Sequence, residues 1–172
     1  VCVHALKGES GNVPFRSSAL DGAIQTAERI PDLRITAVAM EDFDGAELLR
    51  SSMALAADKA LLLQGHGPSP YDCVGLGAML AEAVRTAEGE PDPVDAVFCG
   101  DSDLGQDGLG PALAGYLGWP QVTGVSKVEA DGAGLKVWRN WEGECALLQV
   151  ETPCVLSFLP SEDPASYPQL SR

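Results

Sequence analysis

Residues 94–117 read VDAVFCG DSDLGQDGLG PALAGYL, which is an apolar run, a glycine-rich turn and a helical pattern in direct succession. The run 94–99 is typical of a short buried strand, and residues 108–117 are typical of a helix. A strand that passes through a glycine-rich turn into a helix is the repeating unit of folds with a parallel sheet. The segment therefore predicts an α/β fold.

The same unit recurs on the N-terminal side of this segment. Apolar runs at residues 1–6, 33–40 and 59–63 alternate with helical patterns at 19–30, 44–56 and 72–87. The pattern over 44–56 predicts that Leu48, Leu49 and Met53 face the core. This alternation predicts a Rossmann-like parallel sheet with helices on both faces.

The pattern changes after Pro120. Residues 122–130, 135–141 and 145–150 alternate like antiparallel strands, with short glycine-containing turns between them. Residues 153–158 form a further apolar run, which predicts a strand that returns to the main sheet. We therefore expect a single domain over 1–172, with a small antiparallel hairpin near the C-terminus and a polar tail at 160–172.

The charge of the chain excludes two classes of partner. Its 172 residues carry 11 Lys and Arg against 25 Asp and Glu, a net charge of −14. Affinity for nucleic acids and for anionic membranes comes from clustered Lys and Arg, so neither is an expected partner. The hydrophobic fraction of 45% is ordinary for a globular domain with a normal core.

Cysteine usage indicates a reducing, cytoplasmic compartment. The five cysteines are Cys2, Cys73, Cys99, Cys145 and Cys154, and no two of them are close in sequence. Because the chain has no Cys-x-x-Cys pair and only two histidines, we expect no metal site. No apolar run approaches the roughly 20 residues that span a bilayer, so we expect no membrane insertion. No signal peptide is visible, although the sequence does not begin with Met.

Catalytic side chains are scarce. His4 lies in or at the end of the first expected strand, and His66 lies in a loop of Gly and Pro. Neither stands beside a nucleophile in the pattern of a catalytic triad. The carboxylates of Glu41 and Asp42 are interpreted as solvated groups of an acidic chain. The sequence therefore contains no catalytic constellation of its own.

The turn 100–111 is the strongest candidate for a ligand site. In α/β folds, a glycine-rich turn from a parallel strand into a helix brings backbone N–H groups toward anionic ligands. The spacing of its glycines matches neither the dinucleotide-binding fingerprint nor the P-loop. Asp101, Asp103 and Asp107 oppose a phosphate in this turn, so an ordinary strand–helix connection is the alternative interpretation.

Five pieces, in order along nearly the whole chain, carry a family resemblance. They are Val1–His4, Pro14–Ala23, Met53–Ala60, Val97–Gly100 and Leu117–Thr123. The last, Leu-Gly-Trp-Pro-Gln-Val-Thr, is nearly identical to a motif of the β subunit of electron-transfer flavoproteins. The chain resembles that family.

The resemblance implies a function as an electron carrier. A β-type subunit of this family has an adenine-nucleotide α-hydrolase-like domain and pairs with an α-type subunit that holds most of the FAD. The pair takes electrons from a flavin dehydrogenase and passes them to a respiratory acceptor. The β-type subunit itself holds AMP in many members, and a second FAD in others.

The resemblance also implies positions for the nucleotide and for the dehydrogenase. Cofactor-binding residues carried over from the family are Cys2, Val13, Phe15, Met40, Gly100, Asp101, Ser102, Gly108, Leu109 and Gly110. The tail 160–172 resembles the segment that contacts dehydrogenases, with Leu170 at the exposed leucine position.

Two other functions stay open. One is a stand-alone adenine-nucleotide-binding module, similar to universal stress proteins, and the other is a structural subunit with an emptied nucleotide pocket. Trp138, Trp141, Phe158 and Tyr167 are candidate contacts with a partner, and core packing within the chain is an equally open interpretation of them.

Overall fold

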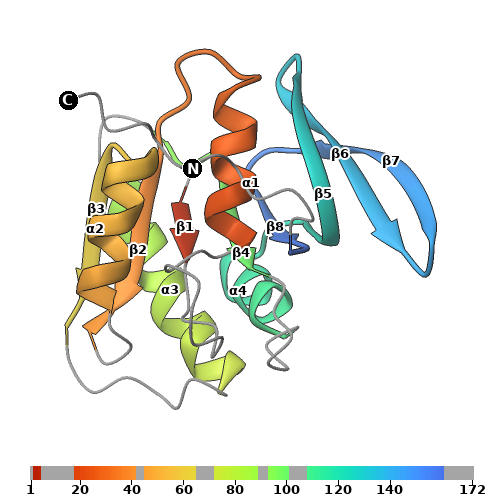
Figure 1. Ribbon diagram of the computed structural model, residues 1–172. Coiled ribbons are helices and arrows are strands. Elements are labelled where there is room, and N and C mark those ends of the chain that lie inside the picture. The colour runs from red at the N-terminus through yellow and green to blue at the C-terminus, as the bar shows by residue number, and fades with distance from the viewer. Residues whose placement is uncertain are drawn as a thin grey trace, which may run out of the picture.

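The protein is an α/β domain built on one eight-stranded sheet (Figure 1). The computed structural model describes residues 2–4, 18–41, 45–64, 72–88, 93–100 and 108–160. The elements are β1 (Cys2–His4), α1 (Ser18–Ala27), β2 (Thr36–Met40), α2 (Gly45–Leu55), β3 (Lys59–Leu63), α3 (Cys73–Glu88), β4 (Ala96–Gly100), α4 (Leu109–Leu117), β5 (Gln121–Asp131), β6 (Gly134–Trp141), β7 (Glu144–Glu151) and β8 (Cys154–Phe158).

The strand order confirms the predicted fold class. The order across the sheet is β3-β2-β1-β4-β8-β5-β6-β7. The first six of these strands are mutually parallel, and β6 and β7 add to β5 as an antiparallel extension. The last strand, β8, inserts between β4 and β5, so it returns to the main sheet as its apolar sequence indicated.

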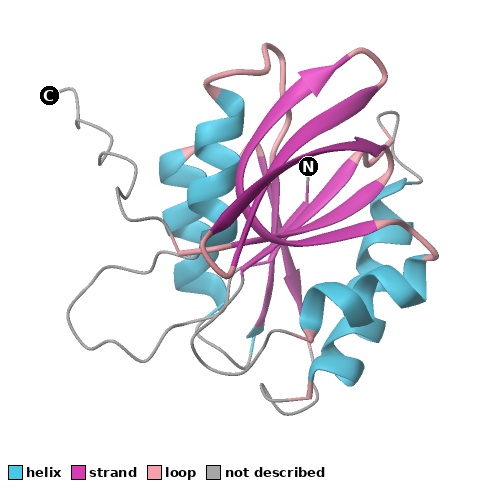
Figure 2. Cartoon of the chain, turned by 90° about the vertical axis from the view of Figure 1, so that its right-hand side faces the viewer, coloured by secondary structure: helices cyan, strands magenta, loops and turns pink. Residues whose placement is uncertain are grey.

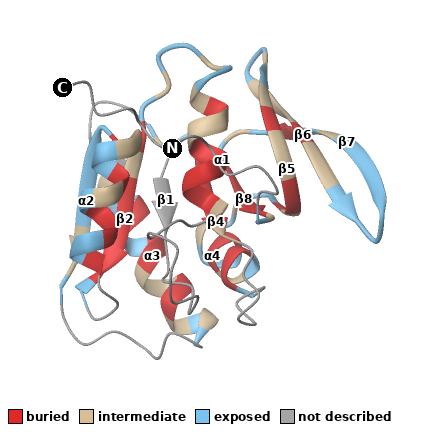
Figure 3. Cartoon of the chain, viewed as in Figure 1, coloured by how far each residue is buried: buried red, intermediate tan, exposed pale blue. Residues whose placement is uncertain are grey.

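Helices cover both faces of the parallel part (Figure 2). Side chains of α1 and α2 form one core with Ala37, Phe98 and Leu156, whereas side chains of α3 and α4 form the other with Val38 and Val97. Successive strand residues enter opposite cores because side chains alternate between the faces of a strand. Strands β2, β4 and β8 are therefore almost wholly buried (Figure 3).

Phe158 corrects one expectation. It was a candidate for an exposed partner contact, but it is 3% exposed and its ring lies 4.6 Å from that of Phe98, centroid to centroid. The strand that carries it is flanked by β4 and β5 and lies beneath α1, so its side chain enters the core.

Met53 corrects a second expectation. It was expected to face the core, but it is 45% exposed. The buried stripe of α2 runs through Gly45, Leu48, Leu49 and Ser52, at i, i+3, i+4 and i+7, which leaves Met53 on the flank of the helix.

Candidate functional site

The carboxyl ends of β1 and β4 mark the point at which the chain changes direction across the sheet. From β1 the chain moves to β2 and β3 on one side, and α3 then carries it back to β4 on the other side. In open parallel sheets, ligands bind in the crevice outside the carboxyl ends of the strands at such a switch point. The architecture therefore places a candidate site at this edge.

Two elements meet closely at this edge. Gly100 is the last residue of β4, and a Cβ added to it would lie 2.9 Å from Oγ of Ser18, the first residue of α1. The start of α1 therefore lies directly beside the end of β4. Sequence reasoning missed Ser18, although serine before an apolar helical stripe is a helix N-terminus signal.

The start of α4 supplies a second set of backbone donors near this edge. Gly108 is the N-cap residue of this helix, and because it has no side chain it provides no capping hydrogen bond. The first N–H groups of a helix have no partner within the helix, so the N-terminus is suited to an anion. Pro111 lies in the first turn and lacks an N–H, which removes one of these donors.

Close packing fixes the position of this helix start. A Cβ on Gly110 would lie 2.1 Å from Oγ of Ser157 in β8, so α4 begins in contact with the sheet only because residue 110 is glycine. A Cβ on Gly108 would lie 3.4 Å from that of Cys73, the first residue of α3. The N-termini of α3 and α4 therefore lie side by side.

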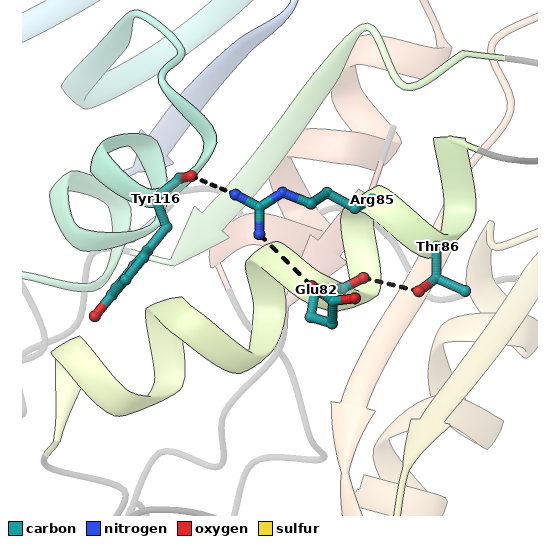
Figure 4. Close-up of polar contacts among 4 residues, drawn as sticks. All are labelled: Glu82, Arg85, Thr86 and Tyr116. Atoms are coloured by element: carbon teal, nitrogen blue, oxygen red, sulfur yellow. Dashed lines mark hydrogen bonds and ion pairs between the residues drawn. The ribbon is translucent and has the colours of Figure 1, made fainter.

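A polar clamp joins the far ends of the same two helices (Figure 4). Arg85 of α3 donates a hydrogen bond of 2.6 Å to the backbone carbonyl of Tyr116 in α4, and it lies 3.6 Å from the carboxylate of Glu82. Between the two ends, Gly77 of α3 allows Ala112 to approach closely. The helices α3 and α4 therefore form one packed pair beside the edge.

A cavity of about 270 Å³ lies at the opposite edge of the sheet. Its walls come from the end of α1, the residues that precede β4 and the β5–β6 turn, and they include Thr26, Ile30, Asp95 and Leu135. This cavity is separate from the carboxyl edge.

The thiols carry no obvious reactive pair. Cys73, Cys99, Cys145 and Cys154 form no disulfide within the described part, and Cys99 and Cys154 are buried. Burial, and to a lesser extent the negative charge of Asp95, together raise the pKa of the Cys154 thiol from 9.0 to about 12. The Cys154 thiol is therefore a buried apolar group rather than a nucleophile.

Neither a cluster of metal-ligating side chains nor a membrane-spanning helix is found in the described ranges. No group of three or more His, Cys, Asp and Glu side chains there is arranged to hold a metal ion. No helix within those ranges is long and apolar enough to cross a membrane.

Comparison with known families decides the assignment. The family model of the electron transfer flavoprotein domain matches residues 2–171 of the chain. The chain belongs to the electron transfer flavoprotein domain family. The resemblance seen in the sequence is thereby confirmed.

Curated relatives of this electron transfer flavoprotein domain agree with the assignment. The electron transfer flavoprotein subunit beta of Thermoanaerobacterium thermosaccharolyticum is 32% identical over 161 residues, which cover 91% of this chain and 59% of that protein. The subunit beta of Homo sapiens is 29% identical over 148 residues, covering 84% and 56%. Protein FixA of Bradyrhizobium diazoefficiens is 31% identical over 153 residues, covering 85% and 52%. The chain thus spans little more than half the length of these relatives.

The structure brings part of the expected nucleotide site of this electron transfer flavoprotein domain to the carboxyl edge. Gly100 ends β4, Gly108 and Leu109 begin α4, and Met40 ends β2. The side chains of Met40 and Leu109 are each 1% exposed and belong to the core under α3 and α4. These two residues therefore offer a ligand only backbone atoms.

Other residues expected at the nucleotide site lie within the sheet and its packing, or outside the described residues. Cys2 begins β1, where it pairs with Thr36 and Val97, and Gly110 is buried against β8. Val13, Phe15, Asp101, Ser102 and Leu170 lie outside the described residues, as does Tyr167.

Proposed function

We propose that the chain is the β-type subunit, or part of it, of an electron-transfer flavoprotein in the cytoplasm. It pairs with an α-type subunit that holds most of the FAD, and the pair carries electrons from a flavin dehydrogenase to a respiratory acceptor. The match of residues 2–171 to the family model is the observation that carries this proposal. The flavin supplies the redox chemistry, and this chain contributes binding surface and orientation.

An adenine nucleotide, either AMP or a second FAD, is the proposed ligand of the carboxyl edge. The described donors suit its phosphate, because no side chain of a described residue caps the start of α4. Residue 100, which ends β4 at the same edge, has no Cβ to obstruct an approach. Ser18, Cys73, Gly100 and Gly108 at this edge are neutral, whereas Asp72, which caps α3, and Glu41, which follows β2, are acidic. The attraction for a phosphate would therefore come from the backbone N–H groups. The site therefore fits a nucleotide held by amide groups rather than by Lys or Arg.

The tail 160–172 is the proposed contact with the dehydrogenase, with Leu170 as its apolar anchor. A single leucine presented on a polar segment suits a transient redox complex, because small interfaces release their partners quickly. Truncation before residue 161 tests this assignment: we expect slower reduction by the dehydrogenase and an unchanged flavin content.

Co-purification tests the pairing itself. The chain is expressed together with the α-type subunit of the same organism, with an affinity tag on one of the two. We expect a complex of one copy of each, yellow from bound FAD. Two chains that purify separately and carry no flavin would contradict the proposal.

A double-mutant cycle tests the nucleotide site. Gly110→Ala places a methyl group 2.1 Å from Oγ of Ser157 and must displace the start of α4. Adding Ser157→Ala removes that oxygen and leaves the new Cβ at an ordinary 3.5 Å from the Cβ of residue 157. We expect weaker AMP binding in the single variant and recovery in the double variant, measured by calorimetry on the heterodimer.

The same titration separates the alternatives. Binding of ATP by the isolated chain at least as tightly as by the heterodimer would favour a stand-alone nucleotide module. Failure of AMP, ATP and FAD to bind this chain, with the heterodimer intact, would favour a structural subunit whose nucleotide pocket is empty. Equal AMP affinity in all members of the cycle would place the nucleotide elsewhere.

A further inference from the structure

Strand β7 forms one end of the sheet. It pairs with β6 along its whole length, and among the described residues no strand pairs with its other side. It lies with β6 at the margin farthest from α2 and β3, and most of it is exposed (Figures 1 and 3). An unpaired edge presents backbone N–H and C=O groups that can bind another strand.

The middle of β7 lacks the features that normally protect an edge. Residues 145–150 read Cys-Ala-Leu-Leu-Gln-Val, without a charge or a proline, and Leu147 is 56% exposed. Protected edges carry Lys, proline or a bulge, or are short. The opposite edge, β3, has five residues and begins with Lys59, whereas β7 has eight. The two edges therefore differ in length and in charge.

The turn before β7 determines which of its backbone groups face outward. Glu142 and Gly143 have φ angles of 49° and 84°, as in the two-residue turn that joins twisted hairpin strands. In such a hairpin the residues that flank the turn, Trp141 and Glu144, form a hydrogen-bonded pair, and bonded and non-bonded pairs then alternate. The backbone groups of Cys145, Leu147 and Gln149 therefore point away from β6.

A contact on the other side of β6 agrees with this alternation. Trp138 is paired with Leu147, and its carbonyl oxygen accepts a hydrogen bond of 3.2 Å from Oγ of Ser126 in β5. Since that carbonyl points toward β5, the pair of Trp138 with Leu147 is a non-bonded one. The N–H and C=O of Leu147 are thus directed to the open edge.

We propose that β7 accepts an extended segment of a different chain as a further strand, and that this segment has an apolar centre and Lys or Arg at its ends. The charges of the hairpin specify the ends: Glu142 and Glu144 lie at the start of β7 and Glu151 at its finish, and all three are exposed. A cationic residue at each end of the added strand meets these carboxylates. The proposal rests on β7 alone and holds whether or not the proposed function does.

The same charges argue against a second copy of this chain. Antiparallel pairing of two β7 edges brings Glu142 and Glu144 of one copy beside Glu151 of the other. Like charges that face each other across strands destabilise the pair. Each copy also carries a net charge of −14, so two copies repel each other at low salt.

A designed peptide provides the test. The probe is acetyl-Lys-Val-Thr-Val-Thr-Val-Thr-Lys-amide with a fluorescein label, titrated with the full chain and followed by fluorescence anisotropy at low salt. We expect saturable binding, and at least about tenfold weaker binding of the same peptide with Glu in place of both Lys. Equal affinity for the two peptides, or no binding of the Lys peptide, overturns the proposal.

Proline variants identify the edge that binds. Leu147→Pro removes an outward N–H and blocks an added strand, but leaves the bonds to β6 in place, because proline is tolerated where the N–H faces solvent. We expect at least about tenfold weaker peptide binding with little change in the melting temperature. Leu147→Thr keeps the N–H and removes the apolar side chain, so it should retain most of the affinity.

Two controls separate this effect from misfolding and from self-association. Leu148→Pro removes an N–H directed to β6, so we expect a clear fall in the melting temperature, unlike the result for Leu147→Pro. Unimpaired peptide binding by a folded Leu147→Pro variant overturns the proposal. Sedimentation that shows a dimer of the wild type and a monomer of Leu147→Pro would make a second copy the occupant, and would overturn it as well.

Discussion

Gly22 shows how one missing side chain sets the distance between two layers. A Cβ at this position of α1 would lie 2.3 Å from the ring of Phe158, so the helix reaches β8 only because it has no side chain there. The ring in turn packs on Phe98. Helix α1 begins beside Gly100, and the close contact of Gly22 with Phe158, about one turn further along, therefore fixes its position.

Replacing this glycine tests that close approach. Gly22→Ala must push α1 off Phe158, and we expect a loss of about 1–3 kcal/mol in the free energy of unfolding, measured with urea. Gly115→Ala is the matched control: it also lies in a helix, but its added Cβ would have no neighbour within 4 Å. That variant should gain about 0.5–1 kcal/mol from helix propensity. Losses of similar size in both variants would contradict the packing argument.

The buried thiol of Cys154 makes stability depend on pH in the alkaline range. Its pKa is raised from 9.0 to about 12 in the folded protein, first by burial and then by Asp95. Below pH 9 the thiol is protonated in both states and its contribution to stability is complete. Between pH 9 and 12 only the unfolded chain releases the proton, so stability falls as pH rises.

Urea unfolding at pH 8 and at pH 10.5 measures this effect. The wild type should lose about 2 kcal/mol more than Cys154→Ala over this interval, because each pH unit above the ordinary pKa contributes about 1.4 kcal/mol. The comparison removes the effects of other groups that titrate in the same range. Parallel losses in the two proteins would mean that the Cys154 thiol ionises normally in the folded state.

At the scale of single elements, capping residues fix where α3 begins. The carboxylate of Asp72 accepts a hydrogen bond of 2.9 Å from the backbone N–H of Gly75. This is the standard arrangement of a helix N-cap, and it satisfies one of the donors that the helix leaves open. The N-terminus that it caps is the one that lies against the start of α4.

Removing the cap should weaken α3 without altering the core. Asp72→Ala is expected to lower the free energy of unfolding by about 1 kcal/mol, whereas Asp72→Ser should restore most of it because serine is also a good N-cap. Thermal unfolding followed by circular dichroism provides the measurement. A serine variant as unstable as the alanine variant would show that the charge of Asp72, rather than its capping oxygen, is what matters.

Element boundaries show where local pattern gives way to tertiary contacts. The sequence predicts that the second strand begins at Leu33, but β2 begins at Thr36. The N–H of Ile35 donates to the carboxylate of Asp58 at 2.8 Å, and the carbonyl of Ile35 accepts from the backbone N–H groups of Asp58 and Lys59. These bonds replace a strand ladder at that point, and their partner lies 23 residues away in sequence.

At the scale of the whole molecule, the fold was predictable because each element carries its own pattern. Alternating strands and helices indicated a parallel sheet, and the change of pattern after Pro120 indicated the antiparallel extension. The burial of Phe158 was not predictable locally, since it depends on β8 lying between β4 and β5 and on the absence of a side chain at Gly22. Strand order is decided by which elements pack together, and short apolar runs do not encode it.

The candidate site was predictable to a lesser extent. Glycines at the end of a strand and the start of a helix indicated the carboxyl edge, where the structure places Gly100 and Gly108. The neighbours that fix these residues, Ser18 and Ser157, come from elements distant in sequence. Their roles follow from how the helices pack on the sheet, which a linear pattern does not show.

The net charge of −14 makes a prediction for the molecule as a whole. The ion pairs of Arg85 with Glu82, Lys127 with Glu129 and Lys136 with Asp131 all lie at the surface, and such pairs contribute little. Repulsion among the excess carboxylates therefore outweighs attraction at low ionic strength, and salt screens it. We expect the melting temperature at pH 7 to rise between 20 mM and 300 mM NaCl, by about 2–4 °C for each kcal/mol of repulsion removed.

The double variant Glu28→Lys with Glu142→Lys changes two exposed positions and makes the net charge less negative by four, so its rise in melting temperature with salt should be smaller. A melting temperature that falls with added NaCl would mean that the ion pairs, rather than the excess charge, control the electrostatics of the fold.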